Sequence, residues 1–184
     1  MAPADRDGWL DVVLGQGELG DDGAALPRGC VPYLPCPVDA LLRAVEQVPV
    51  GAADVFVDLG SGAGRSLILV HLLTGATAIG IEIQPELVRA ARATAACLRL
   101  SRVTTFEGDA TSVTGAAASG SVFFLYCPFS GDRLARLLAE LERLARHRAL
   151  CICAVHLPLP EQRWLRMEPA RHPDLCVFRS STAT

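Results

Sequence analysis

Hydrophobic residues along most of this chain alternate between two spacings. Short, nearly continuous apolar runs are typical of strands buried on both faces, and apolar residues three and four positions apart are typical of helices. The runs predict strands at residues 55–59, 77–83, 103–106, 122–126 and 149–155. The helical spacing predicts one helix that begins at Pro37 and ends by Gly51, and others at residues 65–73, 85–98 and 132–146.

Two apolar stretches near the C-terminus extend this pattern. Residues 164–167 and 176–178 are expected to be strands, and because no helical spacing separates them, we expect an antiparallel hairpin. Alternation of strands and helices indicates a parallel sheet covered on both sides. The predicted fold is therefore α/β: a Rossmann-like, seven-stranded, mostly parallel sheet with helices on both faces. The arginines of the helix at 132–146 are interpreted as its solvated face.

The beginning of the chain follows neither spacing clearly. Residues 1–30 are rich in glycine and aspartate, and we interpret them as a loosely ordered lead-in with at most a short turn at residues 9–14. Residues 31–184 are then expected to form a single domain, because a chain of 184 residues suits one hydrophobic core.

Composition narrows the class of protein. Hydrophobic residues make up 51% of the chain and charged residues 20%, which predicts a packed globular protein. The formal net charge is −3, so no basic excess favours nucleic acid as a partner. All 17 residues of the Lys+Arg total are arginine, so no lysine of this chain can act as a base or form a Schiff base.

The sequence also allows a prediction of the cellular location and of whether the chain binds a metal. The N-terminus has no basic segment followed by an apolar stretch, and the apolar runs elsewhere are too short and interrupted to span a membrane. The seven cysteines include no C-x-x-C pair, so we expect free thiols in a reducing cytoplasm and no metal site. The expected location is cytoplasmic, without membrane insertion.

Candidate chemistry gathers where the predicted strands end. Asp58 closes the first strand and is followed by the turn Gly60–Gly64, while Glu82 and Asp109 follow the next two strands. Since the carboxyl ends of parallel strands meet at one edge of a sheet, these acids are expected to lie close together. Glycine at a sharp turn indicates that something approaches the backbone closely there.

The glycine turn does not fit a dinucleotide site. The dinucleotide pattern needs a third glycine or alanine where this chain has Arg65. Asp58, just before the turn, also suits a positively charged ligand such as an ammonium or a sulfonium better than a phosphate. A nucleotide-cofactor oxidoreductase is therefore disfavoured.

The stretch 57–64, V-D-L-G-S-G-A-G, together with the two later acids, resembles the class I S-adenosylmethionine-dependent methyltransferases. The resemblance implies that S-adenosylmethionine is the cofactor and that residues 31–184 are a methyltransferase domain. It implies that the glycine turn wraps the methionine part, that Glu82 takes the ribose hydroxyls and that Asp109 meets the adenine amino group. The implied cofactor-binding residues are Tyr33, Asp58, Gly60, Ser61, Gly62, Gly64, Glu82, Ile83, Asp109 and Ala110.

A second segment narrows the resemblance to one branch of this family. The stretch 32–37, P-Y-L-P-C-P, is similar to the P-Y-[VL]-P-T-P segment of seven-strand protein-lysine methyltransferases, which include archaeal enzymes and the enzyme acting on the ATP synthase c-subunit. The resemblance implies that Pro32, Tyr33 and Pro35 help to close the cofactor pocket. Cys36 stands where that branch often has threonine, so the family's hydroxyl is missing there.

The fourth strand end carries the candidate acceptor site. Methyltransferases that act on bases or glutamine often have [ND]-P-P-[YF] here, whereas this chain has Tyr126-Cys127-Pro128-Phe129. The missing Asn or Asp disfavours those substrates, and the four residues are predicted to contact the methyl acceptor, with Tyr126 as the candidate catalytic group. His156, just past the fifth strand, is a weaker candidate for a residue that reaches the site.

The leading hypothesis is thus an S-adenosylmethionine-dependent protein-lysine N-methyltransferase. Two alternatives remain open: a methyltransferase acting on a small molecule, and a cofactor-binding module without transfer activity. The expected partner is a protein or small-molecule methyl acceptor, and nucleic acid is not expected.

Overall fold

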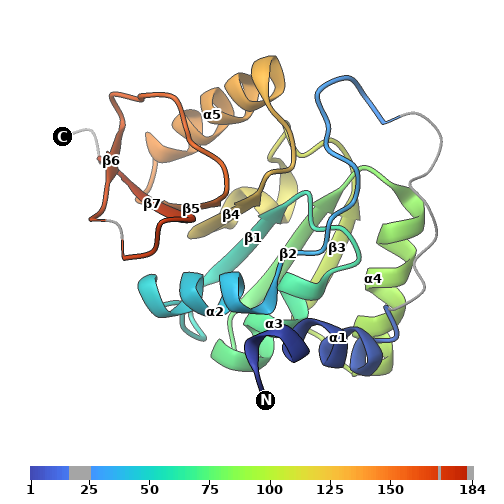
Figure 1. Ribbon diagram of the computed structural model, residues 1–184. Helices are drawn as coiled ribbons and strands as arrows, with labels where there is room; N and C mark the ends of the chain where they lie inside the picture. The colour runs from blue at the N-terminus through green and yellow to red at the C-terminus, as the bar shows by residue number, and fades with distance from the viewer. Residues whose placement is uncertain (17–25, 170, 182–184) are drawn as a thin grey trace.

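The computed structural model describes residues 1–16, 26–169 and 171–181. Its centre is a seven-stranded sheet with the strand order β3-β2-β1-β4-β5-β7-β6 (Figure 1). The predicted α/β fold with a mostly parallel sheet is confirmed. The strands are β1 (Val55–Leu59), β2 (Thr77–Glu82), β3 (Val103–Glu107), β4 (Val122–Tyr126), β5 (Cys151–Val155), β6 (Leu165–Met167) and β7 (Leu175–Ser180).

Strand direction and order locate the place where a ligand is expected. Neighbouring strands from β3 across to β5 run parallel, and β7 lies antiparallel between β5 and β6, as the predicted hairpin requires. The order reverses at β1, which pairs with β2 on one side and β4 on the other. Open parallel sheets bind ligands at the carboxyl ends of the strands beside such a reversal. A ligand is therefore expected at the ends of β1, β2 and β4.

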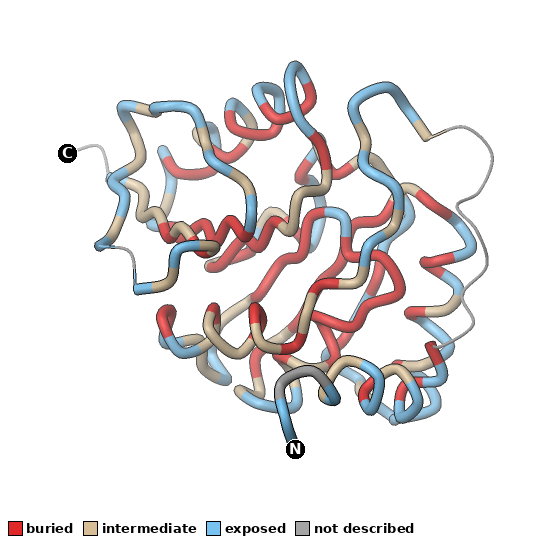
Figure 2. The backbone as a smooth tube through the Cα atoms, in the orientation of Figure 1, coloured by how far each residue is buried: buried red, intermediate tan, exposed pale blue. Residues whose placement is uncertain are grey.

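Helices cover both faces of this sheet, as predicted. The helices α2 (Val38–Gln47), α3 (Arg65–Thr74) and α4 (Pro85–Cys97) pack on one face, and α5 (Gly131–Ala145) with the 3₁₀ helix η1 (Gly115–Ser119) packs on the other. Side chains alternate along each strand, so that Phe56 joins the first of these cores and Val57 the second. Figure 2 shows the strands as the most continuously buried part of the chain. Within the described ranges no helix combines the length and apolar character needed to cross a bilayer.

The structure differs from the sequence-based expectation at the N-terminus. Residues 3–14 form the helix α1 (Pro3–Leu14), where a loosely ordered lead-in with at most a turn was expected. Leu10 and Leu14 are buried in the core on the α2–α3 side of the sheet. The amphipathic pattern of α1 is hard to recognise because two of its acids also face the protein. The rest of the expected lead-in, at residues 17–25, lies outside the described residues.

Hydrogen bonds and ion pairs join helix α1 to the glycine turn and to the start of α2. The guanidinium of Arg65, which is 4% exposed, donates to Asp7 at 2.8 Å and also to Asp11. Asp7 accepts in addition from the backbone N–H of Val38 at 2.9 Å. The side-chain amide of Gln16 donates to the carbonyl of Ala63, inside the turn, at 2.7 Å. Because Arg65 directly follows the turn, α1 supports the backbone geometry at the end of β1.

Removing both carboxylates should test this attachment. We expect Asp7→Asn with Asp11→Asn to lower the free energy of unfolding by about 2 kcal/mol, because Arg65 stays buried without an anionic partner while the two acids themselves are partly solvated. Asp5→Asn, on the exposed side of the same helix, is the matched control and should cost less than about 1 kcal/mol. Urea denaturation measures all three proteins, and equal losses for the pair and the control would contradict this role of Arg65.

Candidate functional site

A cavity lies at the carboxyl ends of the central strands. Its floor comes from the ends of β1, β2 and β4, and its cover is the segment 26–34, which crosses in front of these ends in Figure 1. Ten residues that the sequence singled out border it: Pro32, Tyr33, Gly60, Glu82, Ile83, Ala110, Tyr126, Cys127, Pro128 and Phe129. The remaining wall includes Cys30, Gln84 and Arg133.

A smaller cavity adjoins the first one beside the glycine turn. The two share Tyr33, Gly60 and Tyr126, and the smaller one is also lined by Asp58 and Ser61. Asp109 borders neither of these two cavities, but it borders a third hollow between the end of β3 and η1. The fold thus gathers most of the predicted residues, with Asp109 at the margin.

The glycine turn is packed closely by the protein itself. Its glycines at 60, 62 and 64 have positive φ angles of 93°, 52° and 80°, which side chains rarely tolerate. A Cβ on Gly62 would lie 2.2 Å from Cε2 of Tyr33, and a Cβ on Gly60 would lie 2.7 Å from Cβ of Pro128. The close approach that the glycines predicted is therefore made by the covering segment and by the β4 loop.

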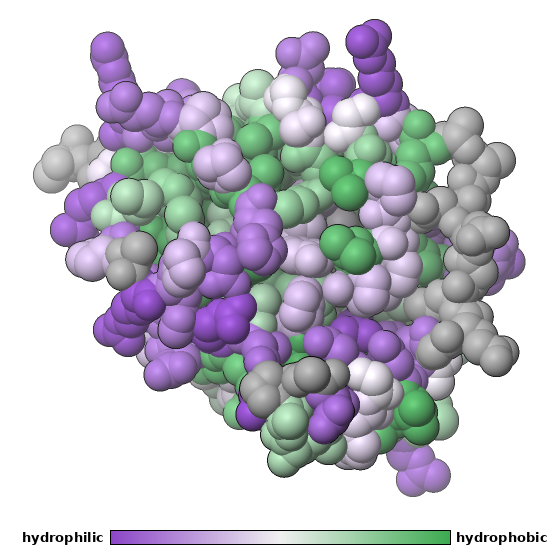
Figure 3. All heavy atoms as spheres, in the orientation of Figure 1, coloured by the Kyte–Doolittle hydropathy of each residue, from purple (hydrophilic) through white to green (hydrophobic). Residues whose placement is uncertain are grey.

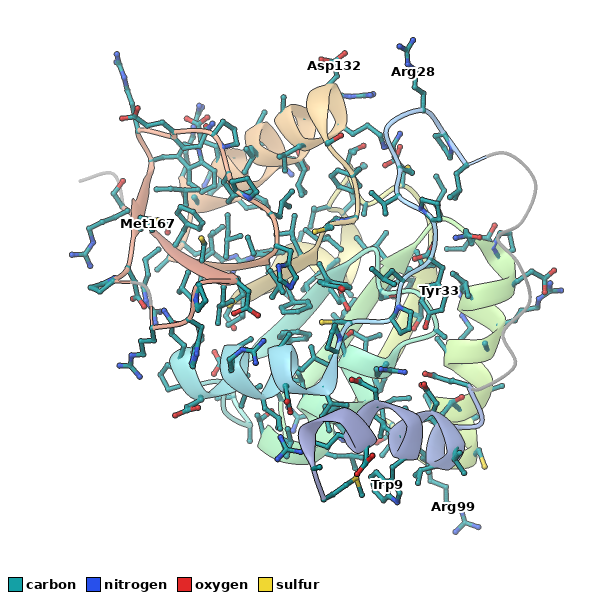
Figure 4. The ribbon with its side chains drawn as sticks, viewed as in Figure 1. Trp9, Arg28, Tyr33, Arg99, Asp132 and Met167 are labelled. Atoms are coloured by element: carbon teal, nitrogen blue, oxygen red, sulfur yellow. The ribbon has the colours of Figure 1, made fainter. Side chains whose placement is uncertain are left out.

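Backbone hydrogen bonds hold the covering segment on the β4 loop. The N–H of Val31 donates to the carbonyl of Pro128 at 3.2 Å, and the N–H of Ser130 donates to the carbonyl of Gly29 at 3.1 Å. Tyr33 follows in the same segment and is half-buried over the turn (Figure 4). Val31 and Leu34 are exposed apolar residues of this segment, and apolar side chains are visible where it crosses the molecule in Figure 3.

Two carboxylates lie near the phenol of Tyr33. Burial raises the pKa of Tyr33 to about 12, and the nearby carboxylates of Glu82 and Asp58 act in the same direction, against a hydrogen bond with the backbone of Ala63. The phenol therefore stays protonated at any physiological pH. Tyr33 can serve as a wall and a hydrogen-bond donor but not as a base.

Asp58 is buried without a cationic partner among the described residues. Its side chain accepts a hydrogen bond from the hydroxyl of Ser66, on the first turn of α3. Burial raises the pKa of Asp58 to about 7, the hydroxyl opposes this shift, and the charge of Glu82 adds to it. A carboxyl group in this state gains from the arrival of a positive charge.

Glu82 organises the backbone around it. One carboxylate oxygen accepts from the N–H of Gly62 at 2.9 Å, and the other accepts from the N–H of Gln84 at 2.8 Å. The residue is 5% exposed and borders the large cavity. Each carboxylate oxygen has two lone pairs, so both oxygens keep an acceptor site for a further donor.

The carboxylate of Asp109 accepts more hydrogen bonds from the protein itself than the sequence implied. Its Oδ1 accepts from the N–H of Thr111 at 2.9 Å, from the hydroxyl of Thr111 at 2.8 Å and from the guanidinium of Arg133 at 2.6 Å. Partial burial alone would raise the pKa of Asp109, but these bonds and the charge of Arg133 outweigh it, so that the net shift is downward. Only Oδ2 is left for an additional donor.

Arg133 is the site residue that the sequence reasoning missed. The arginines of α5 were interpreted as solvated, yet Arg133 is 8% exposed and its guanidinium lies 5.5 Å from the centre of the Phe129 ring. The spacing does contain a signal, because residues 133, 137 and 141 recur every fourth position on the buried side of the helix. The prediction that Arg133 lies on the solvated face is wrong, because the position of a residue along the helix decides which side it faces, whatever its charge.

The acidity of Asp58 should make stability depend on pH. The unfolded carboxyl loses its proton near pH ~4, whereas the folded one keeps it up to about 7. Between these values the folded protein binds more protons, so the free energy of unfolding should fall as pH rises from ~4 to ~7, by about 1.4 kcal/mol per pH unit from this group.

Substitution isolates the contribution of this carboxyl group. We expect Asp58→Asn to flatten the pH dependence of unfolding measured in urea between pH 5 and 8, because the amide does not titrate. Asp132→Asn is the control, since Asp132 is exposed at the start of α5 and points away from the molecule in Figure 4. A variant at position 58 with the wild-type slope would show that Asp58 is ionised throughout this range.

Comparison with known proteins identifies the family to which this chain is similar. The model of the family described as "Methyltransferase domain" matches residues 51–156, which include the glycine turn and the ends of β1, β2 and β4. The search of curated proteins finds no match.

Solved structures with this fold include methyltransferases. An RNA methyltransferase from Salinibacter ruber in complex with S-adenosyl-L-homocysteine is 25% identical, with a TM-score of 0.63 over 80% of this chain and 92% of that one. A mutant of MtNAS in complex with S-adenosylmethionine is 15% identical, with a TM-score of 0.64 over 79% of this chain and 62% of that one. A geranyl diphosphate C-methyltransferase from Streptomyces coelicolor A3(2) is 16% identical, with a TM-score of 0.55 over 64% and 44%. The last two likenesses concern the fold alone.

The family match spans more than half of the chain, and the cavity lies at the strand ends it includes. The chain belongs to the methyltransferase-domain family and is an S-adenosylmethionine-dependent methyltransferase.

Proposed function

We propose that this methyltransferase transfers the methyl group to the side-chain nitrogen of a lysine in a protein. The observation that carries the proposal is the position of the P-Y-L-P-C-P segment, whose Tyr33 packs on Gly62 and faces both cavities together with Tyr126. That segment is the one that resembles the protein-lysine branch. The Tyr126-Cys127-Pro128-Phe129 sequence, without Asn or Asp, supports an acceptor other than a base or glutamine amide.

The cofactor fits the donors and acceptors of the site. Asp58 and the turn from Gly60 to Gly64, with Ser61, would hold the methionine part, because a buried carboxyl without a cationic partner suits the ammonium group. The spare lone pairs of Glu82 would accept from the two ribose hydroxyls. Ile83 and Ala110, both near the large cavity, would contact the adenine, whose amino group has Oδ2 of Asp109 available.

The chain itself aligns the reactants and excludes water. Adenosylmethionine supplies a methyl group on a good, neutral leaving group, so alignment accounts for much of the rate. Tyr33, Tyr126 and Pro128 would form the walls between cofactor and acceptor. Partial burial raises the pKa of Tyr126, which makes this phenol a poor proton acceptor at neutral pH. Tyr126 is therefore proposed to position the amine rather than to deprotonate it.

A small-molecule acceptor is the second candidate. The cavity is lined by apolar and aromatic side chains together with a few polar ones, which is typical of small-molecule sites. The guanidinium of Arg133, stacked on Phe129 in its wall, would suit a ligand with an anionic or aromatic group. A third candidate, a binding module without transfer, is distinguished from both by activity.

The role of Glu82 can be tested by binding. Glu82→Gln should weaken S-adenosylhomocysteine binding by about 1–3 kcal/mol, because the amide can accept at only one atom and presents a donor to the other ribose hydroxyl. Titration calorimetry measures the affinity, and a parallel unfolding curve corrects for the loss of one backbone bond.

Glu107→Gln is the matched control for this experiment. Glu107 is the register partner of Glu82 on β3 but is exposed, so its variant should bind like the wild type. Wild-type affinity in Glu82→Gln would overturn the assignment of Glu82 to the ribose.

The acceptor is tested by following labelled methyl groups. With tritiated S-adenosylmethionine and an extract of the source cells, label should appear in protein, survive nuclease treatment and be released as methyl-lysine on hydrolysis. Tyr126→Ala should lower this transfer about tenfold or more through misalignment, while Tyr126→Phe, which keeps the ring, should retain most of it.

Other distributions of the label would reject the lysine proposal. Label confined to small molecules would favour the second candidate, and label removed by nuclease would identify nucleic acid as the acceptor. Tight binding of S-adenosylhomocysteine without any labelled product would favour the module without transfer.

A further inference from the structure

Two neighbouring strand ends adopt an uncommon backbone conformation. Cys127, directly after β4, has a φ of 45°, and His156, directly after β5, has a φ of 50°. Residues other than glycine rarely occupy this region, and they concentrate at functional sites when they do. The thiol of Cys127 donates to the carbonyl of His156 at 2.9 Å, so the two turns are joined.

The imidazole of His156 lies beside a wall of the cavity. Its ring centre is 6.2 Å from that of Tyr126, and Tyr126 lines both cavities. His156 is itself exposed, so a group on the surface of another protein can reach it. The hydrogen bond from Cys127 is accepted by the backbone carbonyl of His156. Any residue at position 156 could accept it, so this bond does not explain why a histidine stands there.

Asp174 contacts the backbone of His156, and its carboxylate lies near enough to interact electrostatically with the imidazole. The backbone N–H of His156 donates to the carbonyl of Asp174 at 2.8 Å, and the Asp174 side chain pairs with Arg43 of α2. Burial alone would raise the pKa of Asp174, but its hydrogen bonds and the charges of Arg43 and His156 outweigh this and lower it. Asp174 is therefore ionised at neutral pH. Among the described residues, the contacts place four titratable or charged groups here: Tyr126 at the end of β4, Cys127 directly after it, Asp174 before β7 and, paired with Asp174, Arg43 of α2.

We propose that His156, whose ring lies beside Tyr126 in the cavity wall, accepts the proton of the acceptor ammonium. This inference rests on the proposed lysine acceptor. A free lysine amine is protonated at neutral pH, with a pKa near ~10.4, and cannot attack until that proton leaves. Both tyrosines at the cavity are poor bases, since the pKa of each is raised.

The proposed step balances without a further reactant. The neutral imidazole takes one proton from the ammonium, which becomes an amine with a lone pair. The lone pair forms the new N–C bond while the C–S bond of the sulfonium breaks, and the electron pair of that bond stays on sulfur as a neutral thioether. The methylated nitrogen carries the positive charge, and the imidazolium loses its proton to solvent.

The test is the pH dependence of transfer at saturating cofactor. The cofactor must be saturating because Asp58 also titrates in this range, and its ionisation would change the affinity for the cofactor. At saturation a change in that affinity no longer alters the rate. The probe is the labelled protein fraction of the source-cell extract. With the wild type, the rate should rise and then level off between pH 5 and 8, where imidazoles ordinarily titrate.

The variant His156→Asn removes the base but keeps a residue that tolerates positive φ. We expect about a 100-fold lower rate near pH 7. The defect should shrink toward pH 9.5, because an amine that is already neutral needs no base. Affinity for S-adenosylhomocysteine should stay within about twofold. His147→Asn is the control, since His147 is exposed at the opposite end of the sheet, in the turn before β5.

A purely structural role would give another result. His156→Gly accepts the same backbone angle and leaves room for added imidazole, which should restore part of the rate at pH 7 if a base is missing. A defect in His156→Asn of equal size at every pH, without rescue of the glycine variant, would overturn the proposal. So would wild-type rates in His156→Asn with methyl-lysine still formed, which would leave the lysine acceptor standing. Absence of methyl-lysine with the wild type would reject the acceptor and this inference together.

Discussion

The ring of Tyr33 occupies the space that a side chain at position 62 would need, and the rest of the site depends on this contact. Glycine at 62 lets the covering segment lie directly on the turn after β1, and the N–H of the same residue is held by Glu82 from the end of β2. The cover, the turn and two strand ends thus meet at one residue. The β4 loop joins them through Pro128, which lies against Gly60 in the same way.

The charges around this contact are distributed unevenly. Two buried arginines are paired with acids: Arg65 with Asp7 and Asp11 of α1, and Arg133 with Asp109. Asp58, in contrast, has a serine hydroxyl as its hydrogen-bond partner and no ion pair within the described residues. Electrostatics therefore favour a cation at the end of β1. This is the location where the sulfonium and ammonium of the cofactor are proposed to bind, and the ionisation of Asp58 on binding would couple affinity to pH.

Most of the fold could be predicted from local spacing. The boundaries of β1 and β4 agree with the prediction, and those of the other predicted strands and helices differ by one to a few residues, because buried parallel strands have continuous apolar runs that end at clear turn signals. Helix α1 could not be predicted in this way. Its acids at positions 7 and 11 look solvated in a sequence, but they face Arg65, which is 58 and 54 residues away along the chain. The role of Arg133 was missed for a related reason: its spacing places it on the buried side of α5, but its partner Asp109 is 24 residues away along the chain.

The sequence by itself determined the alternation of strands and helices, the glycine turn and the acids that follow three strands, because these depend on neighbours within a few residues. Only the tertiary structure decided how those acids are used. Asp109 is taken up by Thr111 and Arg133, Glu82 holds two backbone N–H groups, and Asp58 is left uncompensated, since each outcome depends on residues that the fold brings together from separate strands and helices. The same holds for His156, which the pairing of β4 with β5 places beside Tyr126.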